Sequence, residues 1–90
     1  MTPAGFAINV QTYCLRFDAS ITSYLRTASH NEKVGGVAHS PHLLGLGADV
    51  VYDKPVPLAV RQRTAQALGL LVLEEGDHDH LQPLDWKARA

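Results

Sequence analysis

The 90-residue sequence has a single cysteine, few aromatic residues and no long apolar run. Because Cys14 has no second cysteine to pair with, an internal disulfide is excluded, and the core must hold the fold, with or without a metal. The apolar runs are far shorter than the roughly 20 residues that a membrane helix needs, so we expect no membrane span. The formal net charge is −1, which offers no basic surface of the kind that binds nucleic acid.

The N-terminal stretch also lacks a basic segment followed by a long apolar one. We therefore expect no signal peptide and synthesis in the cytoplasm. Hydrophobic residues make up 46% of the chain, which is typical of a globular protein. No repeat is visible, so residues 1–90 are interpreted as a single small domain.

The order of predicted elements gives the fold class. Rough alternation and β-branched or aromatic residues predict strands over 6–17 and 19–27, and a third strand is predicted over 48–53. A short apolar run predicts a strand over 70–75, and a turn at Gly76 would pair it with a last strand over 78–82. One helix is predicted over 57–68, because Pro57 suits a first helical turn and Gly69 suits the position after the last. Residues 28–47 are predicted to be a long glycine-rich loop, and such a stretch is usually functional or hides a short helix, for which residues 29–34 could supply one turn. We predict an α+β fold with a small antiparallel sheet, one main helix and this loop.

Two short segments concentrate residues that can bind a metal. The first, "HSPHLLGLGAD", contains His42 and Asp49, with glycines between them that would let the backbone turn both side chains toward one centre. The second, "EEGDHDH", contains His78 and His80, which would face the same side of a strand. One of these histidines could bind the metal and the other lie beside it. A catalytic zinc ion takes three such ligands and keeps a position for water, and Asp77 could accept a proton from that water.

The pattern S-x-H-x-x-G-x-(small)-x-D followed by D-H-x-H resembles the zinc D-Ala-D-Ala carboxypeptidase and L-alanyl-D-glutamate endopeptidase family, which shares its fold with the hedgehog signalling domain. Gly47 stands where the family usually has alanine. The upstream stretch "ITSYLRTASHNEKVGG" is similar to the family's "ITSGYRSPEYNRRVGG" and matches it at Ile21, Thr22, Ser23, Arg26, Asn31, Val34, Gly35 and Gly36.

The resemblance implies a role for each matching residue. The zinc ligands would be His42, Asp49 and His80. Asp77 would be the general base and then the acid that protonates the leaving amine, and His78 would stabilise the oxyanion. Two further residues would serve the substrate and its surroundings: Arg26 would bind a substrate carboxylate or polarise the scissile carbonyl, and Ser40 would support the ligand loop.

The expected function is a zinc-dependent peptidase that hydrolyses peptide bonds of bacterial peptidoglycan by a metal-activated water. The D-Ala-D-Ala carboxypeptidase and L-Ala-D-Glu endopeptidase types both stay open. The expected partners are peptidoglycan peptides, and the absence of a signal peptide favours a phage or prophage origin. Glu74 and Glu75 remain alternatives to Asp77 as the base. The alternative function is a non-catalytic zinc-binding structural or cell-wall-binding module of the same fold.

Overall fold

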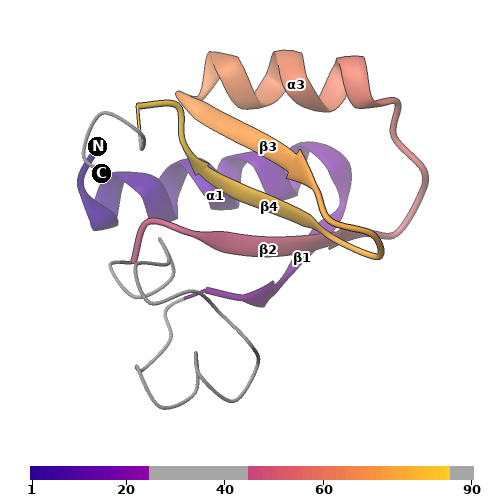
Figure 1. The fold of residues 1–90 in the computed structure, drawn as a ribbon, viewed down its shortest axis with the longest axis horizontal. Coiled ribbons are helices and arrows are strands. Elements are labelled where there is room, and N and C mark those ends of the chain that lie inside the picture. Colours follow the sequence, from indigo (N-terminus) through magenta and orange to yellow (C-terminus); the bar gives the residue numbers. More distant parts are fainter. Residues whose placement is uncertain (25–44, 86–90) are drawn as a thin grey trace.

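The computed structural model describes residues 1–24 and 45–85. In chain order the elements are α1 (Pro3–Phe17), β1 (Ala19–Ser23), β2 (Ala48–Tyr52), α3 (Leu58–Ala67), β3 (Leu70–Glu74) and β4 (Asp79–Pro83), shown in Figure 1. The four strands form one antiparallel sheet in the order β1-β2-β4-β3. The predicted α+β class and antiparallel sheet are therefore confirmed for the described residues.

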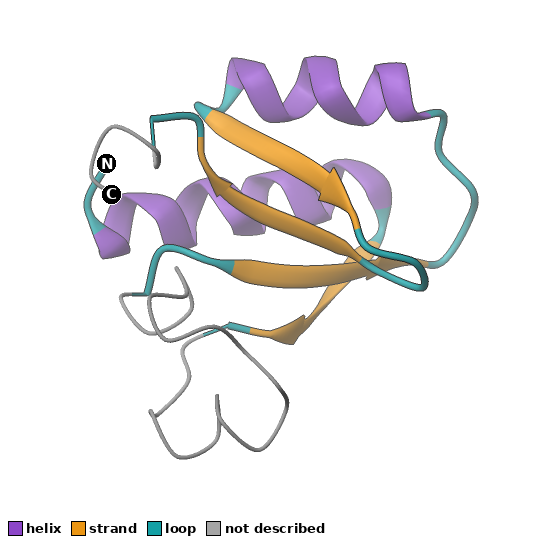
Figure 2. Cartoon of the chain, viewed as in Figure 1, coloured by secondary structure: helices purple, strands orange, loops and turns teal. Residues whose placement is uncertain are grey.

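The strand predicted over residues 6–17 is wrong, because this segment lies inside α1 (Figure 2). Its buried residues, Phe6, Val10, Tyr13 and Cys14, recur at the spacing of one helix face. The helix starts at Pro3, whose fixed φ suits a first turn, and the Thr2 hydroxyl oxygen accepts a hydrogen bond from the Gly5 amide at 3.1 Å. The described part of the fold thus has two helices, and the prediction of one main helix is corrected.

The remaining predicted elements lie close to where the sequence placed them. The helix predicted over 57–68 is α3, with Pro57 as the residue that caps its start. The strands predicted over 48–53, 70–75 and 78–82 are β2, β3 and β4. The strand predicted over 19–27 is described as far as Ser23, the end of β1. Most of the predicted glycine-rich loop 28–47 lies outside the described residues.

The core lies between the sheet and α1, which runs behind the strands in Figure 1. Side chains alternate between the two faces of a strand, and Val50 of β2 and Leu81 of β4 are fully buried on the core side. The intervening residues Asp49 and His80 therefore project from the opposite face. β2 and β4 are central strands, so this opposite face presents its polar residues at the middle of the sheet.

Candidate metal centre

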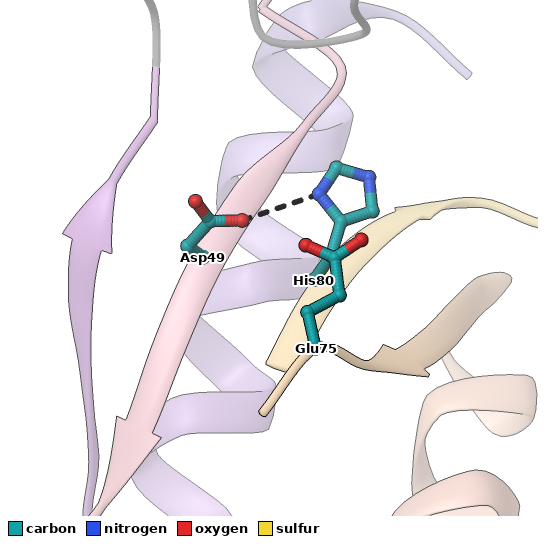
Figure 3. A group of neighbouring side chains, drawn as sticks. All are labelled: Asp49, Glu75 and His80. Atoms are coloured by element: carbon teal, nitrogen blue, oxygen red, sulfur yellow. Dashed lines mark hydrogen bonds and ion pairs between the residues drawn. The ribbon is translucent and has the colours of Figure 1, made fainter. Parts of the chain in front are cut away.

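Asp49 and His80 are partners across the β2–β4 pair. Thirty-one positions separate them in the sequence, yet the antiparallel register places them directly opposite each other. Asp49 Oδ1 and His80 Nδ1 are 3.2 Å apart, and the side chains are 15% and 8% exposed. Figure 3 shows both side chains on the face of the sheet turned away from α1. The sheet thus brings a carboxylate and an imidazole together in a largely dry position.

Glu75 joins this pair from the turn between β3 and β4 (Figure 3). The turn is closed by a hydrogen bond from the Glu75 amide to the His78 carbonyl at 2.9 Å, and Gly76 supplies the positive φ of 85° that it needs. One atom each from Asp49, Glu75 and His80 lie within 4.8 Å of one another. The three side chains form a group that could hold a cation.

His78 lies between three carboxylates at the edge of this group. Its Nδ1 is 2.8 Å from Asp77 Oδ1, its Nε2 is 3.2 Å from Glu75 Oε1, and Nε2 is 3.9 Å from Asp49 Oδ2. The hydrogen bond to Asp77 raises the pKa of His78, the neighbouring Asp49 and Glu75 carboxylates add to that rise, and partial burial opposes it. The same bond lowers the pKa of Asp77, whose side chain is 97% exposed. Both groups are therefore biased toward their charged forms.

Glu74 takes no part in this group. Its Oε2 accepts a hydrogen bond from Arg61 Nη2 at 3.2 Å, and Arg61 Nη1 also donates to Asp79 Oδ2 at 2.6 Å. Asp79 is buried on the core side of β4, the face opposite His80. Of the two glutamates left open by the sequence, Glu75 is the one beside the candidate metal ligands.

Comparison with known proteins identifies the chain. A family model described as Peptidase M15 matches residues 7–82. The chain belongs to the Peptidase M15 family. The predicted family is confirmed, and membership implies the hedgehog/DD-peptidase fold and indicates a zinc-dependent metallopeptidase. No curated protein and no solved structure shows a significant match to the chain.

The Asp49–His80 geometry fits the zinc ion that M15 peptidases use. Zinc binds carboxylate oxygen and histidine nitrogen at about 2.0–2.2 Å, and tetrahedral ligands at such distances are roughly 3.3 Å apart. The 3.2 Å between Asp49 Oδ1 and His80 Nδ1 agrees with that separation. An oxygen donor and a nitrogen donor are also the chemistry that zinc accepts.

Several predicted M15 site residues lie outside the described residues. Arg26, Ser40 and His42 fall in the segment 25–44, so their proposed roles stay predictions. Among the described residues, the structure brings Asp49, His78 and His80 together. Asp77 stands next to them through its hydrogen bond to His78 rather than at the centre of the group.

Gln82 also belongs to this group, although it lies outside the sequence motifs. Gln82 Oε1 lies 2.9 Å from His80 Nε2, and the Gln82 residue is 7% exposed. The signal that could have found it is its position two residues after His80, which places both side chains on the same face of β4.

No helix among residues 1–24 and 45–85 is long and apolar enough to cross a membrane.

Proposed function

We propose that this M15 protein is a zinc-dependent peptidase that hydrolyses peptide bonds of bacterial peptidoglycan. The observation that carries the proposal is the cross-strand pair of Asp49 and His80, with Glu75 beside it, in a chain of this family. Both the D-Ala-D-Ala carboxypeptidase and the L-Ala-D-Glu endopeptidase reactions are compatible with such a site. We further propose that the protein acts on the cell wall, as a phage or prophage enzyme would.

Asp49 and His80 would hold the zinc ion, with His42 as the third protein ligand. When bound, zinc supplies Lewis acidity, which activates water for attack and polarises the scissile carbonyl. The low exposure of both described ligands supports this role, because a dry site strengthens every electrostatic interaction inside it.

Glu75 is the carboxylate that we propose for proton transfer, in place of Asp77. It would accept a proton as water adds to the carbonyl carbon and deliver that proton to the nitrogen as the C–N bond breaks. This role is supported by the position of Glu75, which has a carboxylate oxygen within 4.8 Å of the ligand atoms of Asp49 and His80. The Asp77 side chain, in contrast, is 97% exposed. Asp77 would instead orient His78 through the 2.8 Å hydrogen bond.

His78 would stabilise negative charge on the carbonyl oxygen during attack. Its raised pKa, caused first by the hydrogen bond to Asp77, favours the charged ring that such a role needs. Arg26 and Ser40 keep their proposed roles in substrate binding and loop support.

The test combines metal analysis with digestion of peptidoglycan fragments. We expect one zinc ion per chain and muropeptide products, identified by mass spectrometry, whose masses show which bond was cut. Asp49→Asn should lose both the zinc and the activity, because it removes a charged ligand. Asp53→Asn is the matched control, since Asp53 is an exposed aspartate just beyond the end of β2.

Two outcomes would contradict the proposal. Zinc-loaded protein that leaves every fragment intact would favour the alternative function, a non-catalytic zinc-binding module. Equal zinc content and activity in Asp49→Asn and the wild-type protein would show that the pair described above is not the metal site.

A further inference from the structure

Gln82 is a buried polar residue with its side-chain oxygen directed at the ring of His80. It lies on β4 and is 7% exposed, and its Oε1 is 2.9 Å from His80 Nε2. A buried amide next to a buried ring costs free energy unless the two are hydrogen bonded, so this contact constrains both side chains.

The contact determines which ring nitrogen carries a proton. A carbonyl oxygen can only accept, so His80 Nε2 must donate its proton to Gln82 Oε1. A neutral His80 ring then presents its lone pair at Nδ1. That lone pair faces Asp49 Oδ1, a second acceptor, at 3.2 Å. Two acceptors at this distance are favourable only when a cation, either a proton or a metal ion, lies with them.

We propose that Gln82 is a positioning residue that fixes His80 in the Nε2–H tautomer and turns Nδ1 toward Asp49 as the metal-binding atom. This inference rests on the proposed zinc site. Histidines that bind metals commonly donate their second ring N–H to an oxygen acceptor, and loss of that partner weakens metal affinity by roughly 10–100-fold.

The two contacts together also fix the rotation of the ring. One nitrogen is held by Gln82 on the same strand and the other faces Asp49 on the neighbouring strand. Without the Gln82 acceptor, the ring could turn or exchange its tautomer, and Nδ1 would spend less time in the orientation that binds. The expected effect is therefore on metal affinity first and on turnover only through it.

The experiment compares Gln82→Met, Gln82→Glu and Gln62→Met with the wild-type protein. Methionine keeps the length and removes the acceptor, whereas glutamate keeps an acceptor. Gln62 is an exposed glutamine on α3 and serves as the matched control. Zinc affinity is measured by competition with a chromophoric chelator. The protonation of His80 Nδ1 and Nε2 is read from two-bond ¹H–¹⁵N NMR spectra of the metal-free protein, with the signals assigned from a His80→Asn variant.

We expect Gln82→Met to bind zinc about 10–100-fold more weakly and to lose the fixed proton on Nε2. Gln82→Glu and Gln62→Met should stay within about threefold of the wild-type affinity and keep that proton. Equal affinities for Gln82→Met and Gln62→Met, or a wild-type His80 without a proton on Nε2, would overturn the inference. The wild-type NMR measurement decides even where Gln82→Met fails to fold.

Neither readout requires peptide hydrolysis, so the two proposals fail separately. A chain that binds zinc in a Gln82-dependent way but cuts no muropeptide retains the positioning role and loses the peptidase function. A chain that cuts muropeptides with Gln82→Met at full zinc affinity retains the function and loses the positioning role.

Discussion

Glu75 and Asp77 lie two residues apart in one turn, yet their surroundings differ strongly. Both carboxylates bond to His78, but Asp77 is 97% exposed, whereas Glu75 is 47% exposed and lies with the two candidate ligands. Spacing in the sequence could not separate them, because the turn at Gly76 decides which carboxylate folds back over the sheet. The resemblance to the family favoured Asp77, because D-H-x-H matches the pattern of its bacterial peptidases directly.

Paired substitutions distinguish these two carboxylates. We expect Glu75→Gln to lower kcat by roughly 10²–10⁴-fold with zinc affinity nearly unchanged, because it removes a proton acceptor. Asp77→Asn should have a much smaller effect, through the orientation of His78. The measurements are steady-state kinetics on a muropeptide and zinc competition.

The reverse order of effects would restore Asp77 as the base. A large loss of zinc affinity in Glu75→Gln would instead make Glu75 a metal ligand. Each result therefore assigns the carboxylate to one role.

At the scale of elements, the sequence was most misleading over α1. Ile8, Val10 and Thr12 are β-branched and alternate with other residues, which favours a strand by local propensity. The segment is helical because its buried positions pack on the sheet, and because Thr2 caps the first turn and Pro3 suits its first position. Local preference was overridden by packing, and the helix-start signal at Thr2–Pro3 was the evidence that could have corrected the prediction.

The N-terminal cap of α1 gives a stability prediction. Thr2→Ala should lower the free energy of unfolding by about 1 kcal/mol, because the Gly5 amide loses its acceptor. Thr12→Ala is the matched control, since the exposed Thr12 hydroxyl donates to the Ile8 carbonyl within the helix. Thr12→Ala should leave the free energy of unfolding unchanged or raise it slightly. Urea denaturation at a fixed zinc concentration measures the free energy of unfolding of both variants. Equal losses in Thr2→Ala and Thr12→Ala would contradict a stabilising role for the Thr2 cap.

β4 is held on its core side by a buried polar network that begins at Asp79. Asp79 Oδ2 accepts from Arg61 Nη1 and from the Tyr52 hydroxyl, each at 2.6 Å, and the Tyr13 and Tyr52 hydroxyl oxygens are also 2.6 Å apart. Burial, reinforced by the bond to Asp79, raises the pKa of Tyr52, so the phenol stays protonated. The network connects α1, β2, α3 and β4 beneath the candidate metal centre.

Removal of Arg61 should therefore be costly. Its side chain and that of Asp79 are 11% and 6% exposed, and breaking a buried ion pair typically costs about 3–5 kcal/mol. We expect Arg61→Met to lose that much stability in urea denaturation. Arg63→Met, at an exposed arginine on the same helix, should change little. Adding Asp79→Leu to Arg61→Met should recover part of the lost stability. A double variant with a lower free energy of unfolding than Arg61→Met alone would contradict this explanation.

At the scale of the whole molecule, the sheet was easier to predict than its order. The positions of β2 and β3 follow from their apolar residues, and the start of β4 follows from the turn at Gly76. Their order β1-β2-β4-β3 depends on contacts between distant segments, which periodicity does not encode. Family resemblance predicted Asp49 and His80 as ligands of one metal, whereas their pairing across β2 and β4, and the place of Gln82, needed the register of the folded sheet.

Zinc should stabilise the folded chain, because the unfolded chain keeps Asp49 and His80 apart. At free zinc 100-fold above its Kd, we expect a gain of about 2.7 kcal/mol, or a rise in Tm of roughly 10–20 °C for a domain this small. A chelator should reverse the gain, and Mg²⁺ should not reproduce it. Differential scanning calorimetry measures the effect. A zinc-induced rise of the same size in His80→Ala would place the ion elsewhere.

The alternation along β4 constrains how the gene can change. Asp79 and Leu81 serve the interior while His80 and Gln82 serve the candidate metal centre, so a single strand carries two interleaved sets of residues. Deletion or insertion of one codon between the turn and His80 would exchange the two sets, placing the histidine in the interior and the aspartate outside. We therefore expect relatives to keep the four-residue segment from Asp79 to Gln82 free of insertions and deletions.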